Sequence, residues 1–323
     1  MNILKNELPK DKTPYVIENG EGDHYIWNKQ VYTIIATNQS TGNLFEVITI
    51  TGAMNESFPM HLHKNMYESL LVTEGVVDIQ LEKDIITLTR GDYILIPPGI
   101  VHKYVMKAHR TKILSYVVNG SAVDIYKALG VPYNHSKHPS YIEETYSLNK
   151  QELEYNYDIE FTFNNISNEE ITYWRSGEGE NLLTGDQLHS IITTQKDTND
   201  RYIVVSSEGP IGDPIVPHYH EKHTETFYCF EGKVTMWVGN QNEKVTLYPG
   251  DFLHAPAETI HSYRLDAHYT KMIGLLVPGL FEPFFRTLGE PYEHNTFPNL
   301  PNSLDFKKVI ENIDSLDLKF IEK

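Results

Sequence analysis

The sequence predicts an all-β protein made of two tandem jelly-roll β-barrels with a few short helices. Two observations carry this prediction: the chain of 323 residues contains an internal duplication, and most of each copy alternates apolar and polar residues between short turns. A chain of this length suits two domains of about 150 residues better than one compact core.

The duplication appears when the chain is shifted against itself by 157 residues. That shift carries "HYHEKHTETFYCFEG" onto "HLHKNMYESLLVTEG", and a shift of 159 carries "GDFLHAPAETIH" onto "GDYILIPPGIVH". A repeat of this kind indicates one structural unit used twice. The two extra residues fall around "VGNQNEK", where a hairpin loop can lengthen at small entropic cost. We therefore expect domains at residues 1–145 and 173–323, joined by a polar connection over 146–172 with no counterpart in the other copy.

Strands dominate each copy. "GVVDIQLEKDIITLTRGDYILIPPG" alternates Val77, Ile79 and Leu81 with polar residues, and it predicts turns at residues 82–84 and 90–92. The second copy repeats this pattern, and the regular Gly, Asp and Pro punctuation is typical of a jelly roll. Helix is expected in three short pieces: residues 121–130, 280–289 and the amphipathic tail at 303–320.

Composition excludes several classes of partner. The formal charge is −17 with 27 Lys and Arg against 44 Asp and Glu, and no basic run or long apolar window occurs. Neither nucleic acid nor a membrane is an expected partner. The single cysteine, Cys229, permits no internal disulfide, which fits a reducing cytoplasm. The sequence is compatible with a homodimer but does not decide the oligomeric state.

Each copy contains a potential metal-binding set without sulfur. Two histidines two residues apart share a strand face, a glutamate follows five residues later, and a third histidine follows the proline-containing turn. Buried hydrogen-bonded histidines are the simpler reading of an isolated His-x-His pair, but the whole set occurs twice. Such N3O sets suit iron, manganese, cobalt, nickel or zinc. The predicted ligands are His61, His63, Glu68 and His102 in the first copy, and His218, His220, Glu225 and His261 in the second.

The two motifs resemble those of the cupins, and the chain is similar to bacterial bicupin quercetin 2,3-dioxygenases over nearly its whole length, as in "STGNLFEVITITG" and "HYTKMIGLLVPGLFEPFFRTLGEPYE". The resemblance implies a dioxygenase that cleaves the heterocyclic ring of flavonols such as quercetin with O2, releasing carbon monoxide and a depside. It implies one divalent ion per barrel, Fe(II) or Mn(II), with Co(II) or Ni(II) as alternatives. On the resemblance alone, the first site is expected to be at least as active as the second. One departure is Glu258, at a turn position where the first copy has Gly99.

Roles follow for other residues. Glu68 and Glu225 are the predicted catalytic bases for the flavonol 3-hydroxyl. His189 and His223 are interpreted as ordinary residues, with His223 solvated in a loop. Strand parity predicts uncharged inward neighbours for the ligands: Leu70, Val72, Tyr104 and Met106, then Phe227, Cys229, Tyr263 and Leu265.

Two alternatives remain open. An oxalate decarboxylase-like enzyme or an isomerase would keep the ligands but need a charged pocket, and Arg264 has the wrong parity to supply the cation. A nonenzymatic metal- or ligand-binding bicupin would be expected to lose ligands in one copy.

Overall fold

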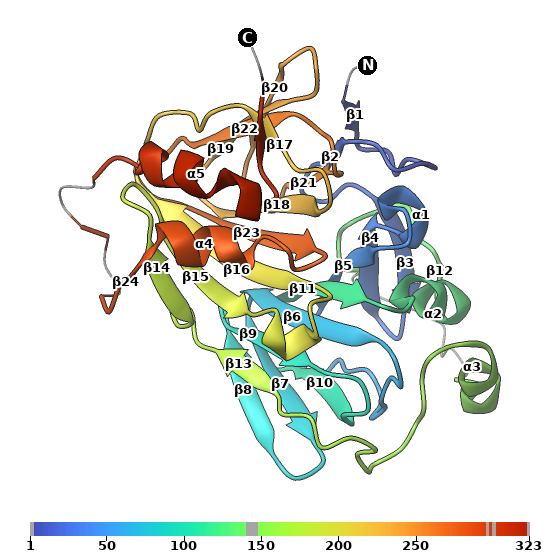
Figure 1. Ribbon diagram of the computed structural model, residues 1–323. Helices are drawn as coiled ribbons and strands as arrows, with labels where there is room; N and C mark the ends of the chain where they lie inside the picture. Colours follow the sequence, from blue (N-terminus) through green and yellow to red (C-terminus); the bar gives the residue numbers. More distant parts are fainter. Residues whose placement is uncertain (1–2, 140–147, 295–296, 299–301, 322–323) are drawn as a thin grey trace. The chain divides into compact units, whose positions relative to one another are not determined.

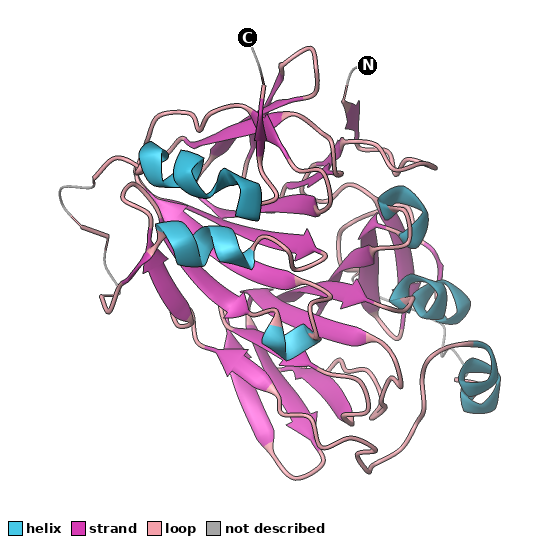
Figure 2. Cartoon of the chain, viewed as in Figure 1, coloured by secondary structure: helices cyan, strands magenta, loops and turns pink. Residues whose placement is uncertain are grey.

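The computed structural model describes residues 3–139, 148–294, 297–298 and 302–321, and the chain divides into two compact units. Residues 20–176 form the first unit, here called the first barrel. Residues 1–19 and 177–323 form the second unit, here called the second barrel. Strand is the main secondary structure of both (Figure 2), so the all-β prediction is confirmed.

The first barrel has two sheets. Its large sheet has the order β12-β3-β4-β5-β11-β6-β9-β13, and its small sheet has the order β10-β7-β8. The strands are β3 (Asp23–Trp27), β4 (Gln30–Ala36), β5 (Phe45–Gly52), β6 (Tyr67–Glu74), β7 (Val76–Leu81), β8 (Ile85–Thr89), β9 (Tyr93–Ile96), β10 (His102–Met106), β11 (Thr111–Val118), β12 (Val131–Pro132) and β13 (Thr172–Trp174). The helices are α1 (Asn38–Thr41), α2 (Ala122–Leu129) and α3 (Lys150–Asn156).

The second barrel repeats this plan. Its large sheet has the order β1-β2-β21-β18-β23-β16-β15-β14-β24, and its small sheet has the order β20-β19-β22-β17-β25. The strands are β1 (Leu4–Lys5), β2 (Tyr15–Ile17), β14 (Glu180–Leu183), β15 (Leu188–Thr193), β16 (Ile203–Gly209), β17 (His218–Tyr219), β18 (Thr224–Glu231), β19 (Val234–Val238), β20 (Glu243–Leu247), β21 (Phe252–Ala255), β22 (His261–Leu265), β23 (Thr270–Val277), β24 (Glu290–Pro291) and β25 (Lys319–Phe320). The helices are α4 (Glu282–Leu288) and α5 (Phe306–Asn312), which lie side by side (Figure 1), with 3-10 turns η1 (Lys196–Thr198) and η2 (Ile313–Ser315).

Local chemistry explains why these elements form where they do. Val77 and Ile79 of β7 are buried while Asp78 is partly exposed, as the alternation predicted. The first two predicted helices are present as α2 and α4, whereas the predicted tail helix is shorter, because α5 ends at Asn312 and β25 follows. Helices α1 and α3 were not predicted. Helix α2 begins at Ser121, whose hydroxyl accepts from the Asp124 N–H, and the buried Glu46 carboxylate accepts from the Val123 N–H.

The second barrel contains a segment from the start of the chain. Strand β2 pairs antiparallel with β21 and places Tyr15, Val16 and Ile17 at 0–2% exposure. The predicted domain boundaries stay a prediction, and residues 145–147 lie outside the described residues. Nothing in the sequence indicated that residues 1–19 group with the second half.

Within the described residues, no helix is both long and apolar enough to cross a membrane.

Candidate metal centres

The first barrel brings together all four ligands predicted for it. His61 and His102 form an antiparallel bridge, and Glu68 comes from β6. One potential ligand atom from each of His61, His63, Glu68 and His102 lies within 4.8 Å of the others, and all four residues are buried. The parity that placed two alternate histidines on one face therefore predicted this convergence correctly.

Backbone carbonyls set the tautomer of these histidines. Nδ1–H of His61 donates to the Pro59 carbonyl at 2.8 Å, that of His102 donates to Ile100 at 2.9 Å, and that of His63 donates to Asp158. A carbonyl oxygen can only accept, so the proton lies on Nδ1 and each neutral ring turns the lone pair of Nε2 to the centre. This is the tautomer that a metal ligand needs.

Burial keeps the imidazoles of His61 and His63 neutral. It lowers the pKa of His61 well below its usual value, and with the charge of His102 it lowers the pKa of His63 to about 4. For Glu68, burial alone would raise the pKa, yet the contacts with His102, His63 and Ser115 lower it below its usual value. At neutral pH His61 and His63 are therefore neutral and Glu68 is ionised.

The contact between His102 and Glu68 fits a shared cation. Nε2 of His102 lies 3.1 Å from Oε2 of Glu68, and Oε1 of Glu68 accepts from the Ser115 hydroxyl. Because Ile100 holds a ring proton on Nδ1 of His102, the lone pair of Nε2 and the carboxylate oxygen are two acceptors that face each other. An ion about 2 Å from each would place its ligand atoms at this separation.

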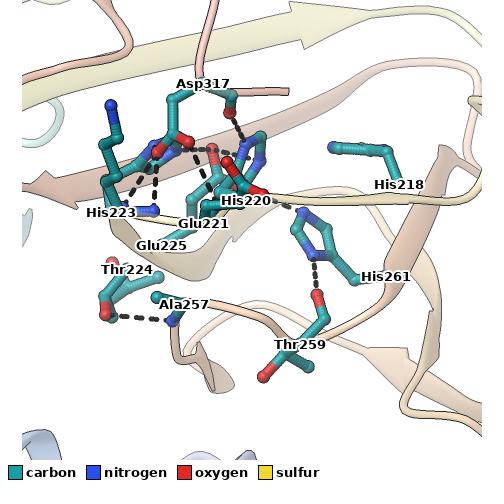
Figure 3. A network of polar contacts seen from close by, with 12 residues as sticks. His218, His220, Glu221, His223, Thr224, Glu225, Ala257, Thr259, His261 and Asp317 are labelled. Carbon is teal, nitrogen blue, oxygen red and sulfur yellow. Dashed lines mark hydrogen bonds and ion pairs between the residues drawn. The ribbon is translucent and has the colours of Figure 1, made fainter. Parts of the chain in front are cut away.

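The second barrel repeats the arrangement with one difference (Figure 3). His218, His220 and His261 form one group, and their Nδ1–H groups donate to the carbonyls of Val216, Asp317 and Thr259. Glu225 is grouped with His220 and His223 instead, although its Oε2 lies 3.1 Å from Nε2 of His261. Nε2 of His220 is buried and makes no hydrogen bond, as expected for a nitrogen that points at an ion.

His223 distinguishes the second site from the first, and its interpretation from sequence as a solvated residue was wrong. It is buried at 0% exposure, its Nδ1 lies 2.8 Å from Oδ2 of Asp317, and its Nε2 lies 3.4 Å from Oε1 of Glu225. Burial would lower its pKa, but the two carboxylates raise it above the usual value. The first copy has Met66 at the matching position, so Glu68 has no such partner.

Sequence reasoning missed two residues that hold the predicted ligands in place. The Asp158 carboxylate accepts from the backbone N–H groups of residues 64–66. The Asp317 carboxylate accepts from those of residues 221–223. The interpretation that the connection has no counterpart was therefore wrong. "YDIEF" before and after Asp158 matches "LDLKF" around Asp317 at the same offset of 159, and this signal could have revealed the pair.

The turn at Glu258 keeps the geometry of its glycine counterpart. Gly99 has φ +80° and donates to the His63 carbonyl, and Glu258 has φ +68° and donates to the His220 carbonyl. A side chain is tolerated here despite the left-handed conformation. The departure from the motif therefore keeps the backbone hydrogen bond of the turn.

Comparisons with known proteins agree with this geometry. A family model described as "Cupin domain" matches residues 50–121 and 208–272. The curated quercetin 2,3-dioxygenase of Bacillus subtilis (strain 168) is 47% identical over 335 aligned positions, which cover 99% of each chain. This chain belongs to the quercetin 2,3-dioxygenase family.

Another relative named quercetin 2,3-dioxygenase, from Aspergillus japonicus, is 31% identical over 125 residues, or 37% of this chain and 36% of the relative. Among solved structures, oxalate decarboxylase from Bacillus subtilis at pH 4.6 has a TM-score of 0.56 at 13% identity, covering 83% of this chain and 76% of that one. Procruciferin from Brassica napus has a TM-score of 0.53 at 10% identity, covering 80% and 84%. At these identities the two solved structures show the bicupin fold alone.

The second barrel of this quercetin 2,3-dioxygenase family member contains a cavity that reaches His218 and Glu225. Its volume is about 120 Å³. Of the predicted inward neighbours, Phe227 and Tyr263 line it, whereas Cys229 and Leu265 are part of the apolar core. His189, interpreted from sequence as ordinary, also lines it.

The donor sets of this quercetin 2,3-dioxygenase family member fit a divalent metal ion. Inward nitrogen lone pairs, buried carboxylates and acceptor atoms 3.1 Å apart recur in both barrels. The absence of sulfur from these sets is compatible with several first-row divalent ions.

Proposed function

We propose that this protein cleaves the heterocyclic ring of flavonols such as quercetin with O2 and releases carbon monoxide and a depside. The observation that carries the substrate class is the cavity at His218 and Glu225. Its walls include Phe227, Tyr263 and Phe281, and the described residues that line it include no lysine or arginine. A flat, neutral, aromatic molecule matches such walls.

We propose all eight sequence-predicted residues as metal ligands and Glu68 and Glu225 as the catalytic bases. A divalent ion, when bound, lowers the pKa of a hydroxyl group that coordinates it. The carboxylate of Glu225 or Glu68 then accepts the proton of the flavonol 3-hydroxyl. The carbonyls that hold the histidine Nδ1–H groups keep the rings fixed during this transfer. The apolar walls exclude water from the deprotonated substrate.

Fe(II) or Mn(II) is the proposed native metal, with Co(II) or Ni(II) able to fill the same donor set. Anaerobic removal of metal and reconstitution with each ion would identify the native one from the restored rate. A cytoplasmic location and a homodimer stay predictions from sequence; sedimentation of the purified protein tests the second.

The alternative of an oxalate decarboxylase-like enzyme needs a cation beside the metal. Arg264 does not supply it, because its Nη2 lies 2.9 Å from Oδ1 of Asp266 and its guanidinium lies 6.0 Å from the Trp237 ring centre. The parity argument against Arg264 is consistent with this placement. An isomerase acting on a charged substrate meets the same objection.

The decisive experiment is anaerobic metal reconstitution followed by a substrate panel. Quercetin, a second flavonol and oxalate are each offered with O2, while O2 uptake and CO release are measured. We expect both flavonols to be consumed with CO release and oxalate to remain. Oxalate turnover at a comparable rate would refute the proposal.

A further inference from the structure

The two barrels differ in how much space lies beside their ligands. The duplication matches six residues of the first barrel with six residues of the second. The strand registers agree with this match, because Tyr32 pairs with Ile50 as His189 pairs with Ser207. The first-barrel residues are Trp27, Gln30, Tyr32, Phe58, Tyr104 and Tyr126. Their counterparts, all of which line the cavity, are Thr184, Gln187, His189, Ile215, Tyr263 and Phe285.

Large aromatic side chains fill the first barrel at these positions. The rings of Tyr32 and Tyr126 stack with centroids 4.1 Å apart, Phe58 lies 5.4 Å from Trp27, and it also lies 4.8 Å from the ligand His61. Each of these aromatic residues is at most 6% exposed. The space next to the ligand histidine is therefore occupied by protein.

Three of these positions hold smaller side chains in the second barrel: Thr184 in place of Trp27, Ile215 in place of Phe58, and His189 in place of Tyr32. The surrounding framework is unchanged, because Tyr104 donates to Gln30 at 2.7 Å and Tyr263 donates to Gln187 at 2.8 Å. Loss of side-chain volume within a common framework leaves a cavity.

We infer that the second barrel alone takes the flavonol, and that Thr184, His189 and Ile215 determine this specificity. The inference rests on the proposed function and specifies which of the two centres performs it. It reverses the expectation, based on resemblance, that the first site is at least as active.

The cavity has polar groups suited to a polyphenol. Nδ1 of His189 lies 2.8 Å from the Ser207 hydroxyl oxygen, and Nε2 lies 3.0 Å from that of Thr184. These buried groups can exchange hydrogen bonds with phenolic hydroxyls. Phe281 and Phe284 of the α4 region, and Phe306 of α5, add flat apolar surface for the rings.

Anaerobic titration of the metal-loaded protein with quercetin tests the inference without turnover. Absorbance changes give the number of quercetin molecules bound per chain and their affinity. We expect one per chain in the wild type. Ile215→Phe restores the bulk found at Phe58, and we expect it to weaken binding by about tenfold or more. The matched control is Ile211→Phe, which adds the same bulk at a position 54% exposed and should bind as the wild type does.

Ser207→Ile is the second variant, because the first barrel has Ile50 at that position, and it decides the question if Ile215→Phe does not fold. Metal content and melting temperature must match the wild type for either variant to count. Two quercetin molecules per chain, or unchanged binding in both folded variants, would overturn the inference. The proposed function would still stand in that case if the wild type consumed quercetin. A wild type that neither binds nor consumes quercetin would overturn the proposed function itself.

Discussion

Asp158 in the first barrel and Asp317 in the second share four hydrogen bonds, and Asp317 adds a contact with His223. Each carboxylate accepts three consecutive backbone N–H groups from the loop after its His-x-His pair, and each backbone carbonyl accepts the Nδ1–H of the second histidine of that pair. One residue thus fixes both the loop and the orientation of a ligand.

Replacing Asp317 with Asn should weaken the ion of the second barrel. The Asn amide has one accepting atom, so its NH2 group would face one or two backbone donors. Partners of metal ligands typically contribute about 10- to 100-fold to affinity, and we expect a loss of that size at one of two sites. Chelator competition measures it. Asp314→Asn, at an exposed position three residues earlier, is the control. Unchanged affinity at both sites in a folded Asp317→Asn protein would contradict this role.

The chain should hold up to two divalent ions, because each barrel has a complete donor set. His61→Ala combined with His63→Ala should lose about one ion and keep the other. Elemental analysis after reconstitution provides the count. The pair His109→Ala and His135→Ala, both exposed in the same barrel, should keep both ions. A wild type without stoichiometric metal under all reconstitution conditions would refute the ligand assignments.

Glu225→Gln separates the ligand role of the carboxylate from its role as a base. Gln keeps an oxygen of nearly the same position but does not accept the proton, so kcat should fall by about 100- to 10,000-fold. If the second barrel takes the flavonol, Glu68→Gln should cost much less. Glu221→Gln, four residues away, controls for the charge change. Full activity of the double variant Glu68→Gln, Glu225→Gln, with metal content confirmed, would mean that the proton goes elsewhere.

The free energy of unfolding should decrease as pH rises from about 4.5 to about 7, because Glu46 loses its proton in this range. Burial raises its pKa to about 7, although its hydrogen bonds with Val123 and Ser121 oppose this shift. A raised carboxyl pKa means that the folded state binds more protons than the unfolded state in this window. The contribution of Glu46 to the free energy of unfolding is therefore fully present below the pKa that this residue has in the unfolded state. It is lost as pH rises through about 7, the pKa in the folded state.

The loss is on the order of 3 kcal/mol. Glu46→Gln should remove this pH dependence and unfold at higher denaturant than the wild type at pH 8. Denaturant unfolding at pH 5 and pH 8 measures it, with the exposed Glu170→Gln as control. The same pH dependence in Glu46→Gln and wild type would exclude Glu46 as its source.

The strands and the convergence of the candidate ligands were predictable because each depends on a pattern that the sequence displays. His-x-His parity and the spacing to Glu68 are short-range patterns, and the repeat shows both of them twice. Asp158 lies 95 residues from His63, and a residue that acts through its backbone carbonyl has no characteristic pattern before the fold is known. Only the short match around Asp317 could have linked the two.

Strand parity could not predict that the two barrels differ in the space beside their candidate ligands. Parity predicted Phe227 and Tyr263 at the cavity but gave no information on which helix side chains, such as Phe284 of α4, line it. His223 was misread because its loop is polar in sequence, whereas Asp317 returns from the end of the chain and covers it.

The pairing of β2 with β21 affects how the protein is made and how it could be divided. Residues 15–17 leave the ribosome long before residues 252–255. Strand β2 therefore stays unpaired during synthesis of the first barrel, until β21 has been made. A fragment containing only residues 177–323 would expose the edge of β21, and exposed edge strands promote aggregation. Adding residues 1–19 as a separate peptide should restore that edge, which would make the fragment a split-protein pair whose reassembly can be followed by its solubility.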